Sequence, residues 1–289
     1  MKELVIISGK GGTGKTSITA GFASLARNAV LADCDVDAAD LHLVLDPHPV
    51  KKTVFISGHE AGIMPDKCSD CGLCRTLCRF DAITMDSEGR HAINPFACEG
   101  CGVCVRFCPE QAIAFPEREC GEWFISDTRN GTMVHARLGI AAENSGKLVS
   151  LVRKEARRIA EEQNAELILV DGPPGIGCPV IASITGADCI AAVTEPTLSG
   201  KHDLERLMTL ARHFKIPVKV IVNKWDINQR LTAEIEKGAV ASNAAVIGRV
   251  SYDRNITAAQ IAGKSIIEFG PSTAADEIMK IWEKVCQKI

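Results

Sequence analysis

A short glycine-rich segment near the start of the chain has the residue types and the spacing of a phosphate-binding loop. Its sequence is GKGGTGKT, from Gly9 to Thr16, and it follows the apolar run ELVIIS. Glycines at these positions let backbone N–H groups turn inward around phosphate oxygens, and a following helix directs its positive end at them. We expect Lys15 to reach the outer phosphates and the Thr16 hydroxyl to bind Mg²⁺. The residues predicted to contact the phosphates are Gly9, Lys10, Gly11, Gly12, Thr13, Gly14, Lys15, Thr16 and Ser17.

A second lysine, Lys10, stands near the start of this loop. The segment Lys10–Thr16 resembles K-G-G-x-G-K-[ST], the signature of the deviant Walker A family, which includes MinD, ParA, Mrp-type proteins and the nitrogenase iron protein. The resemblance implies that Lys10 crosses a dimer interface and contacts the nucleotide of the other subunit. A cation delivered in this way stabilises negative charge that develops on the transferring phosphoryl group. Lys10 therefore implies a nucleotide-sandwich dimer, either a homodimer or a heterodimer with a related ATPase.

Three acidic residues match further positions of this family. Asp33 and Asp35 lie at the end of the apolar run AVLADCD and resemble its D-x-D motif, and Asp171 ends LILVD and resembles the Walker B aspartate. The resemblance implies that Asp33 and Asp171 lie near Mg²⁺ and that Asp35 orients the attacking water. An acidic residue at the end of a strand also commonly caps the next helix, which is the alternative. The predicted catalytic residues are thus Lys10, Lys15 and Asp35, and the predicted magnesium site is Thr16, Asp33 and Asp171.

The segment Asn223-Lys224-Trp225-Asp226 follows a later apolar run and is a candidate for base recognition. N-K-x-D is the pattern with which many GTPases read guanine. In ATP-using relatives of the deviant Walker A family, an asparagine at the end of the same strand contacts adenine instead. Lys10 favours ATP over GTP, and the predicted base-binding residues are Asn223, Lys224 and Asp226.

Eight of the 13 cysteines lie between Cys68 and Cys108, in two runs that repeat at an offset of 30 residues. The runs are CSDCGLCRTLCRFDAI, starting at Cys68, and CEGCGVCVRFCPEQAI, starting at Cys98. In a reducing cytosol, dense cysteine favours metal over disulfides. Each run has the C-x-x-C-x-x-C-x-x-x-C spacing of bacterial two-cluster ferredoxins, although Arg79 stands where proline is usual after the first run.

Three thiolates at positions i, i+3 and i+6 suit three corners of a [4Fe–4S] cube, and the fourth ligand comes from the other run. The alternative is a pair of Cys₄ zinc sites, although zinc ribbons generally pair C-x-x-C knuckles at a distance. The predicted ligands are Cys68, Cys71, Cys74 and Cys108 for one cluster, and Cys98, Cys101, Cys104 and Cys78 for the other.

One further cysteine, Cys178, follows the segment Gly172–Gly175, which the resemblance identifies as a second switch loop. The nitrogenase iron protein has a cluster ligand on this switch. We nevertheless expect Cys178 to be a buried structural thiol, because no second ligand is evident nearby.

Outside the cysteine block, apolar runs alternate with helical patterns. The expected strands are ELVIIS, AVLADCD, ELILVDG, CIAAVTE and VKVIVNK, and helices are expected at about 15–27, 146–164 and 199–214. This alternation predicts an α/β fold, a mostly parallel P-loop NTPase sheet with helices on both faces. The expected domains are the two parts of the ATPase, 1–62 and 117–289, and an inserted small α+β ferredoxin-like domain, 63–116.

The composition limits the expected cellular location of the protein and the classes of partner that it could bind. The net charge is −3, with 46% hydrophobic and 24% charged residues, which is typical of a soluble globular protein. The chain lacks the overall positive charge that would predict nucleic-acid binding. The sequence contains no apolar run of about 18 residues, so we expect no membrane span. It also has no basic amphipathic tail, so we expect no stable membrane association. Met1-Lys2-Glu3 leads directly into an apolar run without a secretory segment, so we expect a cytoplasmic protein.

Taken together, the motifs resemble the MinD-superfamily ATPases that contain an inserted two-cluster ferredoxin domain. The expected cofactors are ATP, Mg²⁺ and two [4Fe–4S] clusters. The favoured function is an ATPase whose nucleotide-dependent dimer gates low-potential electron transfer to a redox partner. The alternatives are an Mrp-like ATPase that delivers Fe–S or other metal cofactors to an acceptor protein, and, less favoured, a positioning ATPase with structural clusters.

Overall fold

The structure, a computed structural model, describes residues 1–139 and 144–287 and divides them into two compact units. The larger unit comprises Met1–Thr53, Glu122–Leu138 and the chain from Ser145 onward, and the smaller comprises Val54–Gly121 with Gly139 and Asn144. The smaller unit contains the whole cysteine block and extends beyond both ends of 63–116. Residues 140–143 and 288–289 of the expected second ATPase part lie outside the described residues.

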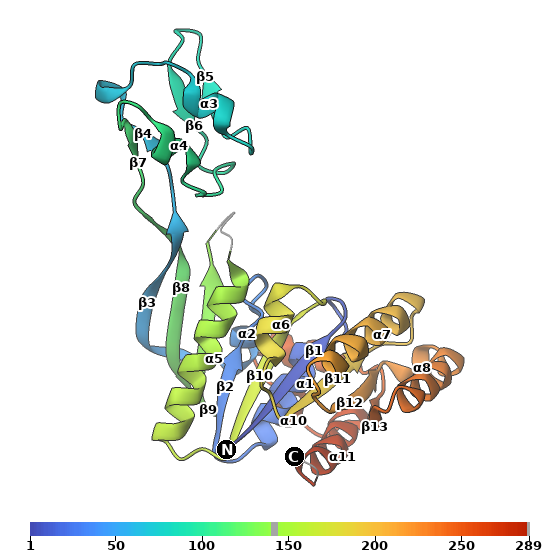
Figure 1. The fold of residues 1–289 in the computed structure, drawn as a ribbon. Helices are drawn as coiled ribbons and strands as arrows, with labels where there is room; N and C mark the ends of the chain where they lie inside the picture. Colours follow the sequence, from blue (N-terminus) through green and yellow to red (C-terminus); the bar gives the residue numbers. More distant parts are fainter. Residues whose placement is uncertain (140–143, 288–289) are drawn as a thin grey trace. The chain divides into compact units, whose positions relative to one another are not determined.

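A nine-stranded sheet forms the centre of the larger unit, in the order β13-β12-β11-β1-β10-β2-β9-β8-β3 (Figure 1). From β13 to β9, each neighbouring pair of strands is parallel, which confirms the predicted mostly parallel sheet. Strands β8 and β9 are joined by the turn Arg129–Asn130. The strands are β1 (Lys2–Ser8), β2 (Ala29–Asp33), β3 (His48–His59), β8 (Glu117–Thr128), β9 (Gly131–Leu138), β10 (Leu167–Pro174), β11 (Cys189–Thr194), β12 (Val218–Asn223) and β13 (Ala245–Val250).

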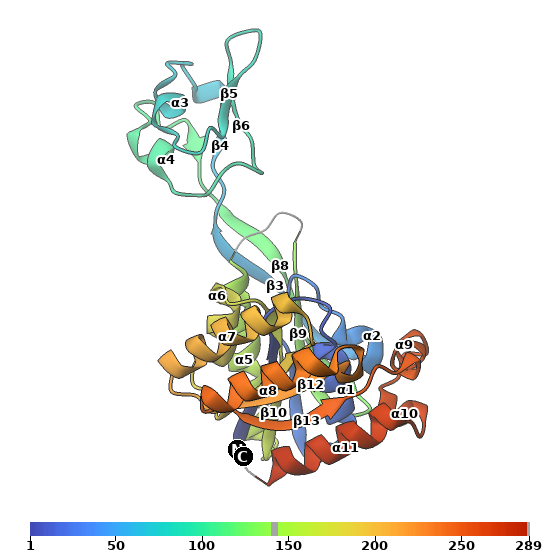
Figure 2. The same ribbon diagram turned by 90° about the vertical axis from the view of Figure 1, so that its right-hand side faces the viewer.

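Helices cover both faces of this sheet, as Figure 2 shows on either side of β12 and β13. One layer contains α1 (Lys15–Leu25), α2 (Leu41–Leu45), α9 (Arg254–Ile261), α10 (Ile266–Phe269) and α11 (Thr273–Cys286). The other contains α5 (Ser145–Glu162), α6 (Cys178–Ile184), α7 (Leu198–His213) and α8 (Gln229–Ala241). Because both faces are covered, the central strands are mostly apolar, and Leu4 to Ile7 of β1 are fully buried.

The parallel register brings the candidate site residues to one edge of the sheet. Asp33 at the end of β2 is the Cα partner of Asp171 on β10, and Ser8 at the end of β1 is the partner of Pro174. The carboxyl ends of these strands therefore meet beside the loop that starts helix α1, where ligands bind in open α/β sheets.

The smaller unit repeats one structural motif twice. Its elements are β4 (Gly62–Ile63), a 3₁₀ turn at Pro65–Lys67, α3 (Leu73–Leu77), β5 (Ile83–Met85), β6 (His91–Ile93), α4 (Val103–Phe107) and β7 (Ile113–Ala114). Strand β4 pairs antiparallel with β7, and β5 with β6. Helices α3 and α4 are related by the 30-residue offset, and each is preceded by a glycine in the left-handed region, Gly72 with φ 75° and Gly102 with φ 72°. The sequence repeat is thus also a backbone repeat.

Among the described helices, none combines the length and the apolar character needed to cross a membrane.

Candidate functional site: a phosphate-binding loop and two cysteine cavities

The glycine-rich loop lies between the end of β1 and the start of α1, the placement that a phosphate-binding loop requires. Two of its glycines admit no other residue. Gly14 has φ 88°, and a Cβ there would overlap the Asn223 amide nitrogen. A Cβ on Gly9 would overlap Asp203. The loop backbone is therefore packed directly against the ends of the neighbouring strands and α7.

A cavity of about 370 Å³ opens over this loop. Of the predicted residues, it is lined by Gly11, Gly12, Thr13, Gly14, Lys15, Thr16, Ser17, Asp35, Asn223 and Lys224. Sequence reasoning missed a second group, from the segment after β13 and from α9, namely Ser251, Tyr252, Asp253, Ile256, Thr257 and Gln260. The one local signal for that group was Asp253, whose side chain caps α9 by accepting from Asn255 N.

Lys15 is buried beneath this cavity among carboxylates. Its Nζ lies 3.0 Å from Asp171 Oδ2 and 3.2 Å from Asp35 Oδ2. Burial opposes the charge on Lys15, but the surrounding carboxylates, Asp171 foremost, raise its pKa. The Asp171 carboxylate also accepts from the hydroxyls of Thr16, at 2.9 Å, and Thr19, at 2.8 Å. Lys15, Thr16, Asp35 and Asp171 are thus brought together.

Asp33 lies fully buried beside this group. Its Oδ1 accepts from the backbone N–H of Asp35, whereas its Oδ2 has no hydrogen-bond partner among the described residues. Burial, with the Asp171 charge adding to it, raises the pKa of Asp33 well above its usual value. Burial likewise raises the pKa of Asp35. Three carboxyl groups therefore surround one lysine at the bottom of the cavity.

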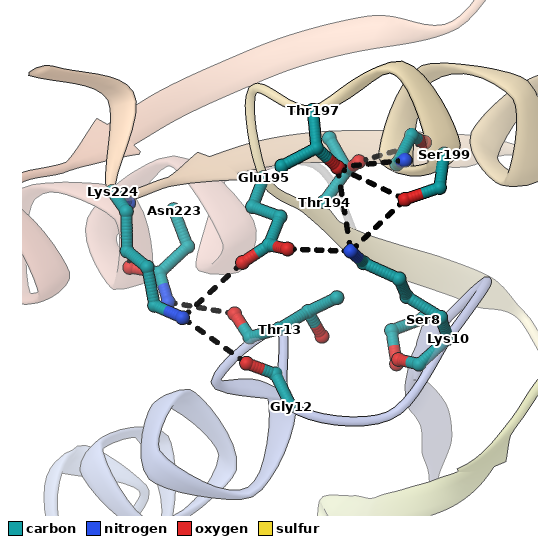
Figure 3. Close-up of polar contacts among 11 residues, drawn as sticks. Ser8, Lys10, Gly12, Thr13, Thr194, Glu195, Thr197, Ser199, Asn223 and Lys224 are labelled. Atoms are coloured by element: carbon teal, nitrogen blue, oxygen red, sulfur yellow. Dashed lines mark hydrogen bonds and ion pairs between the residues drawn. The ribbon is translucent and has the colours of Figure 1, made fainter. Parts of the chain in front are cut away.

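Lys10 is bound within its own chain (Figure 3). Its Nζ lies 2.6 Å from Glu195 Oε1 and donates to the hydroxyls of Thr197 and Ser199, at 3.3 and 3.1 Å. Partial burial opposes ionisation of Glu195, but Lys10 and Lys224 hold the pKa of this carboxyl below its usual range. Sequence reasoning missed Glu195, because it lies far from Lys10 along the chain.

The three predicted base-binding residues hold loops together in this structure. Asn223 Nδ2 donates to Thr13 O at 2.7 Å. Lys224 Nζ donates to Gly12 O at 3.1 Å and lies 3.2 Å from Glu195 Oε2 (Figure 3). Asp226 does not line the cavity, and its Oδ1 accepts from the backbone N–H of Tyr252 at 2.8 Å. Asp226 thereby fixes the segment after β13, which itself lines the cavity.

Glu195 neutralises two lysines that flank the phosphate loop, and this arrangement gives a testable prediction. Glu195→Gln is expected to tighten ATP binding by about threefold to tenfold, since Lys10 and Lys224 would no longer be drawn to a carboxylate in competition with phosphate. The gain should shrink in high salt. Calorimetric ATP titrations at two salt concentrations measure it.

Glu234→Gln is the matched control, because Glu234 also pairs with two cations, Lys201 and Arg230, at an exposed position. Unchanged or weaker ATP affinity in Glu195→Gln would contradict competition between the carboxylate and the phosphates.

In the smaller unit, the eight clustered cysteines are divided between two cavities. One cavity is lined by Cys68, Cys71, Cys74 and Cys108, and the other by Cys98, Cys101, Cys104 and Cys78. Each cavity thus takes three cysteines from one run and the last cysteine from the other. We name them the Cys68 cavity and the Cys98 cavity.

At the Cys68 cavity, backbone N–H groups donate hydrogen bonds to a cysteine sulfur and to a carboxylate. Ala112 N donates to Cys108 Sγ at 3.3 Å. Asp70 Oδ1 accepts from His91 N, and this hydrogen bond is the main reason that the pKa of Asp70 lies below its usual value. No set of three or more His, Cys, Asp or Glu side chains in residues 1–139 and 144–287 is arranged to hold a single metal ion.

The prediction that Cys178 is a buried thiol is wrong. Cys178 is exposed as the first residue of α6, because the preceding segment ends β10 at the surface and α6 begins with Cys178 and Pro179. A proline in the first turn is favourable there, since no N–H donor is lost from the helix.

Comparisons with known proteins agree with this geometry. Residues 4–266 match the family described as the CobQ/CobB/MinD/ParA nucleotide binding domain. An uncharacterized protein of Methanocaldococcus jannaschii is 35% identical over 232 residues, which is 78% of this chain and 79% of that protein. The septum site-determining protein MinD of Pyrococcus horikoshii, solved with Mg-ADP, has a TM-score of 0.60 at 18% identity and covers 98% of this chain and 95% of its own. The MinC:MinD cell division complex of Aquifex aeolicus has a TM-score of 0.57 at 18% identity, with 100% and 97% covered.

Proposed function

Because the chain belongs to the family of CobQ/CobB/MinD/ParA nucleotide-binding domains, we propose that it is an ATP-hydrolysing iron–sulfur protein. In this proposal a nucleotide-dependent dimer gates low-potential electron transfer, through two [4Fe–4S] clusters, to a partner protein. The observation that carries the proposal is the division of eight cysteines into two cavities of four, each completed by a cysteine of the other run.

The nucleotide half of the proposal rests on the loop and the acidic group below it. Backbone N–H groups of the loop surround the β- and γ-phosphates, and Lys15 turns from its carboxylate partners to the phosphate oxygens. Asp33 and Asp171 then keep oxygens for Mg²⁺, which prefers carboxylate and hydroxyl oxygen ligands. The orphaned oxygen of buried Asp33 fits this need.

Asp35 and Lys10 supply the hydrolytic step. Asp35 lines the cavity, and its raised pKa makes it better suited to accept a proton from an attacking water or to orient that water. Lys10 leaves Glu195 and enters the nucleotide site of the second subunit, where it neutralises charge on the transferring phosphoryl group. The second subunit is a copy of this chain or a related ATPase.

The cysteine cavities fit a cubane cluster. The four thiolates of a cubane bind four separate iron atoms, so they must surround a cavity rather than converge on one point, and both cavities have this form. Bound clusters would supply one-electron redox chemistry at low potential. The cysteines of each set, Cys68, Cys71, Cys74 and Cys108 or Cys98, Cys101, Cys104 and Cys78, would hold them.

Coupling between the two halves requires that ATP bind the open and closed dimers with different affinity, since a ligand shifts an equilibrium only through such a difference. We propose that this coupling runs along neighbouring strands of the larger unit. Strand β2 ends at Asp33 beside the magnesium site and pairs with β9, and β9 neighbours β8. Strand β8 begins in the smaller unit, to which its residues up to Gly121 belong.

The test is anaerobic purification followed by metal analysis and redox titration. We expect about eight iron and eight sulfide per chain, and a reduction midpoint that changes when ATP is added. Zinc, or cysteines free of iron, would overturn the cluster assignment. If instead a chelator or an apo-acceptor removes iron in the presence of ATP without unfolding the chain, and the midpoint ignores ATP, the protein is a carrier of metal cofactors.

A further inference from the structure

The two cysteine cavities are related by the 30-residue repeat, so their linings can be compared position by position. Most positions carry equivalent residues, such as Ile63 and Ile93, or Ala112 and Ala82. Polar lining residues differ at four positions. At two of them, Ser69 and Glu110 of the Cys68 cavity correspond to Glu99 and Phe80, which leaves one carboxylate in each cavity, so the other two positions distinguish the cavities. Asp70 in the Cys68 cavity corresponds to Gly100, and His91 corresponds to Ala61 in the Cys98 cavity.

Asp70 and His91 form a polar pair against the Cys68 cavity. Asp70 Oδ1 accepts from the backbone N–H of His91 at 3.0 Å and lies 3.2 Å from its ring Nδ1. The same oxygen is 3.6 Å from Cys68 Sγ. The His91 side chain is 5% exposed, and its Nε2 lies 3.6 Å from the place that a Cβ on Gly72 would occupy. A carboxylate and an imidazole therefore lie next to the sulfur ligands.

The Cys98 cavity excludes such a pair by its backbone. A Cβ on Gly100 would overlap the carbonyl oxygen of His59, so no side chain fits there. Ala61 is buried and offers no polar atom. The carboxylates among the lining residues are Asp70 and Glu110 for the Cys68 cavity and Glu99 alone for the Cys98 cavity. The Cys68 cavity thus has the more negative surroundings.

We infer that the two clusters differ in reduction potential, with the lower potential at the Cys68 cavity, and that Asp70 sets the difference while His91 partly offsets it. This inference rests on the proposed function. Adding an electron beside a fixed negative charge is unfavourable, and a nearby N–H dipole reduces that penalty. Electrons entering the smaller unit then reside on the cluster of the Cys98 cavity, and the cluster of the Cys68 cavity is the stronger reductant.

The experiment is an anaerobic potentiometric titration of the purified full-length protein, followed by electron paramagnetic resonance. Wild-type protein should show two midpoints. Asp70→Gly should raise the lower midpoint potential by about 59 mV, which is a tenfold change in the ratio of reduced to oxidised cluster for one electron. The upper midpoint should stay unchanged. His91→Ala should move the same midpoint downward. The double variant, which gives positions 70 and 91 the residues of positions 100 and 61, should bring the midpoints together.

The substitution of Asp70 by glycine is compatible with the local backbone conformation. Asp70 has φ 48°, in the left-handed region where glycine is favourable, and its counterpart Gly100 has φ 60°. Iron content checks that both clusters remain, and if Asp70→Gly loses iron, Asp70→Asn removes the charge at constant shape and is titrated instead. Asp86→Asn is the control, since Asp86 pairs with Arg90 away from both cavities and should shift neither midpoint.

Two results overturn the inference, namely both midpoints moving together or neither moving in protein with its full iron content. Wild-type protein without iron or sulfide overturns the proposed function instead, so the two failures are distinguishable.

Discussion

Lys10→Ala is expected to abolish ATP hydrolysis while ATP affinity stays within about tenfold of the wild-type value. Lys15 and the inward-facing backbone of the loop still hold the phosphates, whereas no cation would reach the phosphoryl group of the partner site. Phosphate release measures hydrolysis, and equilibrium titration measures affinity. Lys15→Ala is the contrasting variant, because Lys15 lies beneath the cavity and its loss should weaken ATP binding itself.

The proposed action of Lys10 on the other subunit can be tested by mixing two inactive variants. Lys10→Ala subunits keep Asp35, and Asp35→Asn subunits keep Lys10, so a mixed dimer has one complete site. In a homodimer, an equal mixture should recover about a quarter of wild-type activity, because half of the dimers are mixed and each has one working site. Full activity of Lys10→Ala alone, or no recovery in the mixture, would remove the dimer mechanism.

Cys101→Ser is expected to lose about half of the iron and a large share of the visible absorbance, because one of the four thiolates of the Cys98 cavity is gone. ATP binding should be unaffected, since none of the described residues that line the nucleotide cavity belongs to the smaller unit. Iron, sulfide and zinc are counted in anaerobically purified protein, and ATP affinity is measured beside them.

The control for that substitution is Cys286→Ser. Cys286 is an exposed cysteine on α11 in the larger unit and should keep the full iron content when replaced. Unchanged iron in Cys101→Ser, or zinc in place of iron, would show that the Cys98 cavity does not hold a cubane.

The sheet and its loop were predictable because local signals were strong. Continuous apolar runs such as LVII of β1 are typical of strands that are buried on both faces of a parallel sheet, and a loop such as Gly9–Thr16 follows such a strand. The cysteine repeat was equally clear, because its spacing is set by the geometry of a turn and one short helix, seen in α3 and α4.

The long-range polar contacts were not predictable from local pattern. Glu195 meets Lys10 only because β11 lies beside β1, and no spacing in the sequence encodes that neighbour. Asp226 is predicted to bind the base, and the structure adds a contact that the motif did not suggest, because its carboxylate accepts from Tyr252 N in the segment after the neighbouring strand β13. Strand β13 was missed because its apolar run, AVIGRV, is interrupted by a glycine and an arginine and is partly exposed at the sheet edge.

The ion pair between Glu195 and Lys10 has a consequence for the activity of the protein at low concentration. In the structure the charge of Lys10 is neutralised by Glu195 of the same chain. In the proposed mechanism Lys10 acts only in a second subunit, so we expect turnover per chain to rise with protein concentration in dilute solution. A cell with few copies would thus consume almost no ATP through them, and synthesis of more copies alone would switch the activity on.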